Sequence, residues 1–299
     1  MKTSNGALGS KQNFLGLDKE HSTSDSSRVI ILPVPYGIAG SSRGNGPQAI
    51  IQASHRVQRF DEETKRELSK DLGIATLAPL KFTVQKNEAA LQLIHETALG
   101  ILGMNKFLAV LGGGQAITSA VAAAFAKKFD ALSVLQFDAH SGLQDVKTGK
   151  TYDDASAMVR VCEFLDPKKL VQVGTRAQSR EEADFAREHA VKSFYAHEIR
   201  GGTHARFLRG WEDAVVECLT EKVYLTFDVD VLDPSIMPAT HTPEPNGLSW
   251  DEVTRCLRMV GRKINIVGFA FVGFAPIGGL EHPGHTAARL VYKILNYAL

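Results

Sequence analysis

Two short apolar runs in this sequence end in paired acidic and histidine residues that could bind a metal ion. The run LSVLQF is followed by Asp138 and His140, and the run VYLTF is followed by Asp228 and Asp230. The members of each pair are two residues apart, and in extended backbone such residues project to the same side of a strand. We therefore expect the four side chains to converge where two neighbouring strands end.

Three carboxylates and one imidazole make a donor set that is mostly oxygen. Such a set suits manganese best, and magnesium, zinc or nickel less well. Three carboxylates in one crevice repel one another strongly unless a cation or shared protons compensate them. Strand ends are also rich in aspartates that cap helices or form turns, so either pair taken alone has a purely structural alternative. The presence of two such pairs favours the metal site.

From Val29 onward, short β-branched runs alternate with longer segments of helical period. The runs expected as strands are 29–33, 107–112, 132–137, 170–174, 223–227 and 264–269. Helices are expected near 47–57, 88–103, 116–128, 179–190, 205–220, 249–260 and 285–298. This alternation predicts an α/β fold with a mostly parallel central sheet. In such folds the active crevice forms beyond the carboxyl ends of the strands.

The composition excludes several classes of protein. A chain of 299 residues with 44% apolar residues can bury a sizeable core, and its formal net charge of +1 includes no long block of one sign. Nucleic acid and anionic membranes are therefore not expected as partners. The three cysteines, far apart and odd in number, predict buried thiols in a reducing compartment. Because no apolar leader or membrane-spanning run is visible, we expect a cytoplasmic protein.

The sequence offers no internal repeat, low-complexity tract or linker that would divide it into domains. We expect residues 1–28 to form a polar N-terminal lead-in, in which only the segment NFLGL has the apolar character to pack. Residues 29–299 are expected to form a single domain.

Three segments resemble signature motifs of the ureohydrolase family, which includes arginases, agmatinases and formiminoglutamases, and they are most similar to those of agmatinases. The segments are RGNGPQAIIQAS, FDAH and LTFDVDVLDPSIMPATHTPEP, and the resemblance extends to the C-terminal HTAARLVYKIL. It implies the arginase-like fold, a three-layer α/β/α sandwich, assembled into trimers or hexamers. It also implies two manganese ions that lower the pKa of a bridging water, which then attacks a guanidino or amidino carbon.

The resemblance assigns roles to the four residues at the strand ends. Asp138 and Asp228 match the carboxylates that bridge both ions, while His140 and Asp230 match ligands of one ion. Asp138 is for this reason counted among the catalytic residues as well as among the metal ligands.

The ligands that belong to the other ion alone are missing. The family segment Gly-Gly-Glu-His-Ser, or Gly-Gly-Asp-His-Ser, reads GGGQA here, which puts Gln115 in place of a histidine ligand. The segment Asp-Ala-His-Ser-Asp reads DAHSG, which puts Gly142 in place of a carboxylate ligand. A neutral amide is a weak ligand and glycine offers none, so we expect at most one manganese ion, or another divalent metal in its place.

Three further departures from the family pattern fall in the same crevice. Asp154, in TYDDA, stands where the family has a histidine thought to shuttle protons. Gly273 stands where the family has the glutamate that orients the cationic amidine of the substrate, and Ala270 replaces a preceding aspartate. His241 replaces a glycine in Thr-Gly-Thr-Pro-Glu-Pro and adds bulk near the site.

These departures lead to three hypotheses. The first is an agmatinase-like protein, impaired or inactive as a guanidino hydrolase, that acts as a homo-oligomer or as the partner of an active paralogue. The second is an active, urea-releasing hydrolase of a linear amidine or guanidino bond, with a mononuclear or rebuilt site in which Asp154 or His241 serves as base or extra ligand. The third, which the sequence does not separate from the first, is a sensor that binds a small guanidino or amidino ligand.

Overall fold

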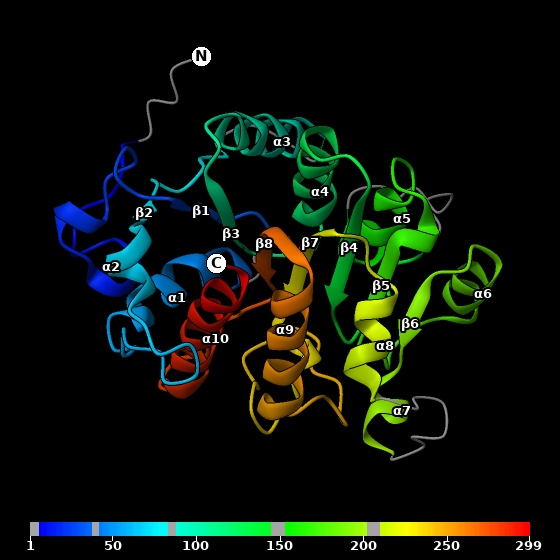
Figure 1. Ribbon diagram of the computed structural model, residues 1–299. Helices are drawn as coiled ribbons and strands as arrows, with labels where there is room; N and C mark the ends of the chain where they lie inside the picture. The colour runs from blue at the N-terminus through cyan, green and yellow to red at the C-terminus, as the bar shows by residue number, and fades with distance from the viewer. Residues whose placement is uncertain (1–5, 38–41, 83–87, 145–152, 202–209) are drawn as a thin grey trace.

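A single sheet of eight parallel strands, in the order β2-β1-β3-β8-β7-β4-β5-β6, forms the centre of the molecule (Figure 1). The computed structural model describes residues 6–37, 42–82, 88–144, 153–201 and 210–299. The strands are β1 (Val29–Val34), β2 (Ile74–Thr76), β3 (Phe107–Gly112), β4 (Leu132–Phe137), β5 (Leu170–Val173), β6 (Lys192–Phe194), β7 (Lys222–Asp228) and β8 (Asn265–Val272). The predicted α/β class with a parallel sheet is confirmed.

Four strands of the sheet are buried along their whole length. Every residue of β1, β3, β4 and β5 is buried, as expected for parallel strands that are covered on both faces. All six predicted strands are present. The two that the sequence did not reveal, β2 and β6, have three residues each and lie at the two edges of the sheet, so their apolar pattern is too short to stand out.

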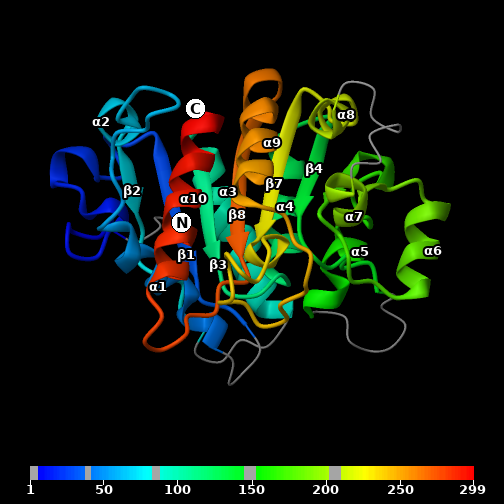
Figure 2. The ribbon, with the colours of Figure 1, turned by 90° about the horizontal axis from the view of Figure 1, so that it is seen from below.

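Helices cover both faces of the sheet and complete the three predicted layers (Figures 1 and 2). One face carries α3 (Glu88–Gly103), α4 (Ile117–Lys128), α5 (Ala157–Val161) and α6 (Arg180–Glu188). The other carries α1 (Gly46–Ser54), α2 (Leu68–Leu72), α7 (Ala196–Arg200), α8 (Trp211–Glu217), α9 (Trp250–Lys263) and α10 (His282–Ala298). The five-residue helices α2, α5 and α7 were not predicted. Within the described part of the chain, no helix combines the length and apolar character that crossing a membrane requires.

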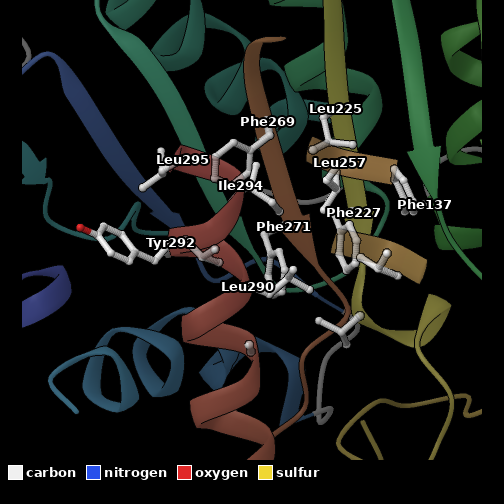
Figure 3. Close-up of a cluster of buried hydrophobic side chains, with 14 of the residues drawn as sticks. Phe137, Leu225, Phe227, Leu257, Phe269, Phe271, Leu290, Tyr292, Ile294 and Leu295 are labelled. Carbon is white, nitrogen blue, oxygen red and sulfur yellow. The ribbon is translucent and has the colours of Figure 1, made fainter. Parts of the chain in front are cut away.

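Aromatic side chains from three neighbouring strands form the middle of the larger core cluster (Figure 3). Phe227 of β7 stacks between Phe137 of β4 and Phe271 of β8, with ring centroids 5.4 and 5.3 Å away. Leu257 of α9 and Leu290 of α10 are buried in the same cluster. This packing fixes the strands β4, β7 and β8 beside one another just before their carboxyl ends, where the candidate site begins.

The N-terminal segment packs against the β2 edge of the sheet. Phe14, Leu15 and Leu17 are buried. The backbone N–H of Phe14 donates to the hydroxyl of Thr76 (2.9 Å), and the N–H of Leu15 donates to that of Ser54 (2.8 Å). The segment NFLGL, the part of the expected lead-in with apolar character, therefore contributes to the core.

A second acidic cluster lies far from the strand ends, where the loop after α1 meets α10. The ammonium of Lys293 lies 2.9 Å from Asp61, 3.0 Å from Glu62 and 2.9 Å from Glu63. Lys293 is 2% exposed and Asp61 is fully buried. We call these four residues the lysine cluster. Its fixed ammonium holds three carboxylates together.

Candidate metal centre

The predicted site residues border a cavity of about 480 Å³ at the carboxyl ends of β4 and β7. These two strands are neighbours in the sheet (Figure 1). Among the described residues that line the cavity, seven are Asp or Glu and none is Lys or Arg. The cavity therefore attracts cations, and its position agrees with the general rule for parallel sheets.

Three of the four predicted ligands converge on one point. One donor atom each from Asp138, His140 and Asp230 lies within 4.8 Å of the other two. Nδ1 of His140 is 2.9 Å from Oδ2 of Asp230 and 3.7 Å from Oδ1 of Asp138. The backbone N–H of Ala139 donates to Oδ1 of Asp230 at 2.9 Å, which ties the two strand ends together. We call Asp138, His140 and Asp230 the donor group.

Asp228 lies in the wall of the same cavity but outside the donor group. The reason is local backbone geometry. Asp228 is the last residue of β7 and has extended backbone, but the chain then enters a 3-10 turn over Val229–Val231, so Asp230 does not lie in extended backbone. The side chain of Asp228 instead caps this turn, where its Oδ1 accepts the N–H of Asp230 at 3.1 Å. The assumption that the two aspartates lie in one continuous extended strand is wrong for this pair, although both border the cavity. The metal-binding role expected for Asp228 stays a prediction.

Burial and mutual contact shift the pKa values of the donor group. Burial raises the pKa of Asp138 to about 7, the negative charge of Asp230 adds to the effect, and His140 opposes it. Burial lowers the pKa of His140, but its hydrogen bonds with Asp138 and Asp230 outweigh burial and raise that pKa to about 11. The imidazole is thus held as a cation between two carboxylates. A metal ion that bound the same atoms would take the place of this proton.

Gln115, at the position of a family histidine ligand, makes a hydrogen bond with the donor group. Its amide nitrogen donates to Oδ2 of Asp138 at 2.7 Å. The same oxygen accepts a second amide N–H, from Gln136 at 3.0 Å. Both glutamines are buried, so these bonds form away from water.

Gln136 was not singled out from the sequence, although a signal was present. It is a fully buried polar residue in an apolar strand, and it pairs in register with Gln172 of β5. Gln172 donates to Oε1 of Gln136 at 2.7 Å and to the carbonyl of Ser141 at 2.7 Å. Because a buried amide needs partners, a glutamine in the same place of two neighbouring apolar strands predicts such a chain of bonds.

Gly142 and Gly273 offer no side chain to the cavity, and both have left-handed backbone. Gly142 has φ +64°, and a Cβ there would lie 3.3 Å from Cγ of Met158. Gly273 has φ +82°, and a Cβ there would lie 2.0 Å from Oδ1 of Asp228. A side chain at 273 is therefore excluded while Asp228 keeps its position.

Asp154 borders the cavity from the side of the GGGQA turn, outside the donor group. Its Oδ1 accepts the backbone N–H of Ala116 at 2.8 Å, just before α4 begins. Gly114 makes room for this contact, because a Cβ there would lie 2.7 Å from the same oxygen. Asp154 thereby holds the turn that carries Gln115. The catalytic role expected for Asp154 stays a prediction.

His241 is exposed at the mouth of the cavity, in the loop between the 3-10 turn after β7 and α9. It does not belong to the donor group, and its role as base or ligand also stays a prediction. Glu244 of the same loop faces His140, with Oε1 3.9 Å from Nε2. The loop thus closes one side of the cavity.

Arg176, which the sequence pattern did not reveal, is hydrogen-bonded to the turn after β7 and to the loop that contains Glu244. Its guanidinium donates to the carbonyls of Asp230 (2.7 Å), Glu244 (2.9 Å) and Pro245 (3.0 Å). Burial lowers its pKa, and the nearby carboxylates of Asp230 and Glu244 oppose that shift. An arginine in the loop after an apolar strand is part of no recognisable motif, so only the structure shows this contact.

The family model described as Arginase family matches residues 27–297. This chain belongs to the arginase family. An N(1)-aminopropylagmatine ureohydrolase of Thermus thermophilus is 36% identical to it over 276 residues, which cover 91% of this chain and 90% of that protein. A protein of the same name from Synechocystis is 32% identical over 298 residues, 97% of this chain and 94% of that protein. The resemblance to ureohydrolases is confirmed.

Solved structures of arginase-family proteins share the fold. Proclavaminate amidino hydrolase of Streptomyces clavuligerus matches with a TM-score of 0.83 at 25% identity, over 96% of each chain. Agmatine ureohydrolase of Thermoplasma volcanium matches with a TM-score of 0.81 at 20% identity, over 99% of this chain and 95% of that one. Family members usually bind manganese, and the donor group of this chain supplies oxygen and nitrogen atoms of the kind such an ion takes.

Proposed function

We propose that this arginase-family protein binds one divalent cation, with manganese the preferred ion, on the donor group, and that it is impaired or inactive as a two-metal guanidino hydrolase. Two carboxylates and one imidazole that converge within 4.8 Å fit a single ion. When bound, such an ion lowers the pKa of a coordinated water. The chain's own residues position the two aspartates and the histidine.

The observation that carries this proposal is the contact between Gln115 and Asp138. A second ion at this position would have to share the carboxylate of Asp138 with the first. Here Oδ2 of Asp138 receives amide N–H groups from Gln115 (2.7 Å) and Gln136 (3.0 Å). An amide NH₂ carries partial positive charge and donates hydrogen bonds, so it opposes a cation at that oxygen. Gln115 would thus compete with a second cation for that oxygen.

The remaining ligand of a second ion is also missing. Gly142 has no donor atom, and a Cβ there would lie against Met158, whose Cγ is 3.3 Å away. Asp228 caps its own turn and does not join the donor group. We therefore propose a small guanidino or amidino compound as a ligand of the cavity rather than as the substrate of a rapid two-metal reaction.

Metal content and turnover test the proposal together. Purified protein that is saturated with manganese and freed of excess ion is expected to contain about one ion per chain by elemental analysis. Asp230→Ala is expected to contain none, because losing even a residue that only supports a metal ligand costs roughly 10- to 100-fold in metal affinity. Hydrolysis of agmatine or N(1)-aminopropylagmatine is expected to stay well below about 1 per second, the low end of ordinary turnover. Two ions per chain would overturn the proposal.

An active enzyme with a rebuilt site is the second candidate. It is supported by relatives at 36% and 32% identity that are named ureohydrolases, and by a donor group that suffices for mononuclear metal hydrolysis. Urea release at about 1 per second or faster by the wild type, abolished in Asp230→Ala, would establish this function in place of the first.

A further inference from the structure

Polar side chains on three neighbouring strands form a chain of hydrogen bonds that ends at the donor group. The hydroxyl of Ser193 on β6 donates to Oε1 of Gln172 on β5 at 3.1 Å. Nε2 of Gln172 donates to Oε1 of Gln136 on β4 at 2.7 Å, and Nε2 of Gln136 donates to Oδ2 of Asp138 at 3.0 Å. The sheet register pairs Ser193 with Gln172 and Gln172 with Gln136. We call Ser193, Gln172 and Gln136 the amide chain.

Two backbone carbonyls fix the direction of the amide chain. A glutamine amide can turn by 180° and exchange its NH₂ group with its oxygen, whereas a backbone carbonyl only accepts hydrogen bonds. Nε2 of Gln172 donates to the carbonyl of Ser141 at 2.7 Å, and Nε2 of Gln136 donates to the carbonyl of His140 at 3.2 Å. A turned amide would place oxygen against oxygen at either position. Both glutamines are at most 1% exposed, so such a contact would be costly.

The direction of the chain decides which group meets Asp138. Because Gln172 presents its NH₂ group to β4, Gln136 must turn its oxygen toward β5 and its own NH₂ group toward Asp138. An amide oxygen in that place would repel the carboxylate, whereas the N–H group holds it. With Oδ2 held in this way, Oδ1 accepts the backbone N–H of His140 at 2.8 Å and lies 3.7 Å from Nδ1 of the same residue. The amide chain thus sets the rotation of the Asp138 carboxylate within the donor group.

We propose that Gln172 is a positioning residue of the metal centre, which acts on Asp138 through Gln136. Gln172 uses its two N–H groups on Ser141 and Gln136, and it thereby fixes which end of the Gln136 amide faces the metal ligand. This inference rests on the proposed single-ion site, since Asp138 belongs to the donor group. A residue that orients a metal ligand in this way typically contributes about 10- to 100-fold in metal affinity. A side chain on β5 thus controls the geometry of a site built from β4 and the turn after β7.

A double-mutant cycle in manganese affinity tests whether Gln172 acts through Gln136. Methionine has nearly the volume of glutamine but no N–H group, so Gln172→Met and Gln136→Met each interrupt the amide chain with little change in packing. Calorimetric titration with manganese is expected to show a loss of about 10-fold in each. The double variant is expected to bind no more weakly than Gln136→Met alone. Ser133→Ala is the control, because Ser133 is a buried polar residue of β4 whose partner, Thr220 at 2.8 Å, lies outside the amide chain.

A spectroscopic measurement on the metal-free protein tests the orientation directly. The side-chain NH₂ signals of Gln136 and Gln115 are followed by NMR in ¹⁵N-labelled protein, and their hydrogen exchange rates are compared. Gln172→Met is expected to accelerate exchange at Gln136 by about 10-fold, the effect of about one lost hydrogen bond, and to leave Gln115 unchanged. A variant that merely loosened the fold would accelerate both. Ser133→Ala is expected to change neither.

Gln172→Glu decides the matter if Gln172→Met does not fold. Glutamate has nearly the same shape, but a carboxyl group carries at most one O–H, whereas Gln172 donates to two acceptors. The same loss of manganese affinity and the same faster exchange at Gln136 are expected.

The outcomes distinguish this inference from the proposed function. Wild-type manganese affinity in Gln172→Met, losses that add in the double variant, or equal acceleration of exchange at Gln136 and Gln115 would each overturn the role of Gln172. A wild type that takes up no manganese would overturn the single-ion site. The exchange rates need no metal and would then still decide whether Gln172 orients Gln136.

Discussion

The lysine cluster and the donor group both bring together carboxylates that repel one another, and the two sites compensate this repulsion in different ways. In the lysine cluster, three carboxylates surround an ammonium that belongs to the chain, at 2.9 to 3.0 Å. In the donor group, two carboxylates surround an imidazole whose charge depends on a proton. The ammonium of Lys293 is a permanent positive charge, whereas a metal ion that bound the donor group would replace the proton of His140. The comparison separates an acidic cluster that stabilises the fold from one that we propose binds a metal ion.

Removing the permanent counterion is expected to have the largest effect. Lys293→Met leaves Asp61 buried beside two further carboxylates without an ammonium, so we expect the free energy of unfolding to fall by about 3 to 5 kcal/mol. Chemical denaturation measures this loss. The surface pair Arg56–Glu281 provides the control, and Arg56→Ala is expected to cost less than about 1 kcal/mol because both side chains are exposed. Equal losses in the two variants would refute the distinction.

Adding the exchangeable counterion is expected to have the next largest effect. At a free manganese concentration about one hundred times the dissociation constant, one bound ion stabilises the folded state by about 2.7 kcal/mol. Asp230→Asn should show no such gain in thermal denaturation. Lys293→Met should keep it in full, because the lysine cluster takes no part in binding the ion. A gain in Asp230→Asn equal to that of the wild type would place the ion elsewhere.

The pH dependence of stability sharpens the comparison further. Burial raises the pKa values of Asp61 and Glu63, but the hydrogen bonds from Lys293 outweigh burial and leave both pKa values lowered. Such carboxylates stabilise the fold fully above their unfolded pKa, about 4, and the stabilisation is lost as the pH falls through their folded values.

Unfolding free energies measured between pH 7 and pH 3 should therefore fall in the wild type. The fall is expected to be smaller than the loss in Lys293→Met at neutral pH, because Glu62 and Glu63 remain partly exposed. In Lys293→Met the slope should weaken or reverse, since the carboxylates then gain by taking up protons. An identical slope in the two proteins would show that the ammonium does not control these pKa values.

Restoring the missing ligands is expected to change metal content at a small cost in stability. Gln115→His with Gly142→Asp should raise bound manganese from about one to about two ions per chain. The cost is about 1 kcal/mol, because residue 142 keeps a left-handed φ of +64° that aspartate tolerates better than most residues. Elemental analysis and denaturation of the double and single variants provide the measurements. A ratio that stays at one would show that the second position is closed by more than these two side chains.

The sequence predicted the parts of this molecule that are encoded locally. Apolar runs marked all six long strands, and the acidic pairs at two strand ends marked three residues that the structure brings together. The separation of Asp228 from the donor group could not be predicted, because residue spacing does not reveal that a 3-10 turn over Val229–Val231 follows β7. Gln136 and Arg176 were missed because their partners Gln172 and Asp230 lie 36 and 54 positions away along the chain.

The N-terminal segment has a further consequence for the sheet that it borders. Strand β2 is an edge strand, and an uncovered edge exposes N–H and C=O groups that can pair with another chain. Here the N–H of Leu8 donates to the carbonyl of Thr76 at 2.8 Å, and Ala7 forms an antiparallel bridge with Leu77. The segment that precedes the first strand thereby acts as a cover against self-association, and a shortened chain that starts at Val29 would present β2 to its neighbours.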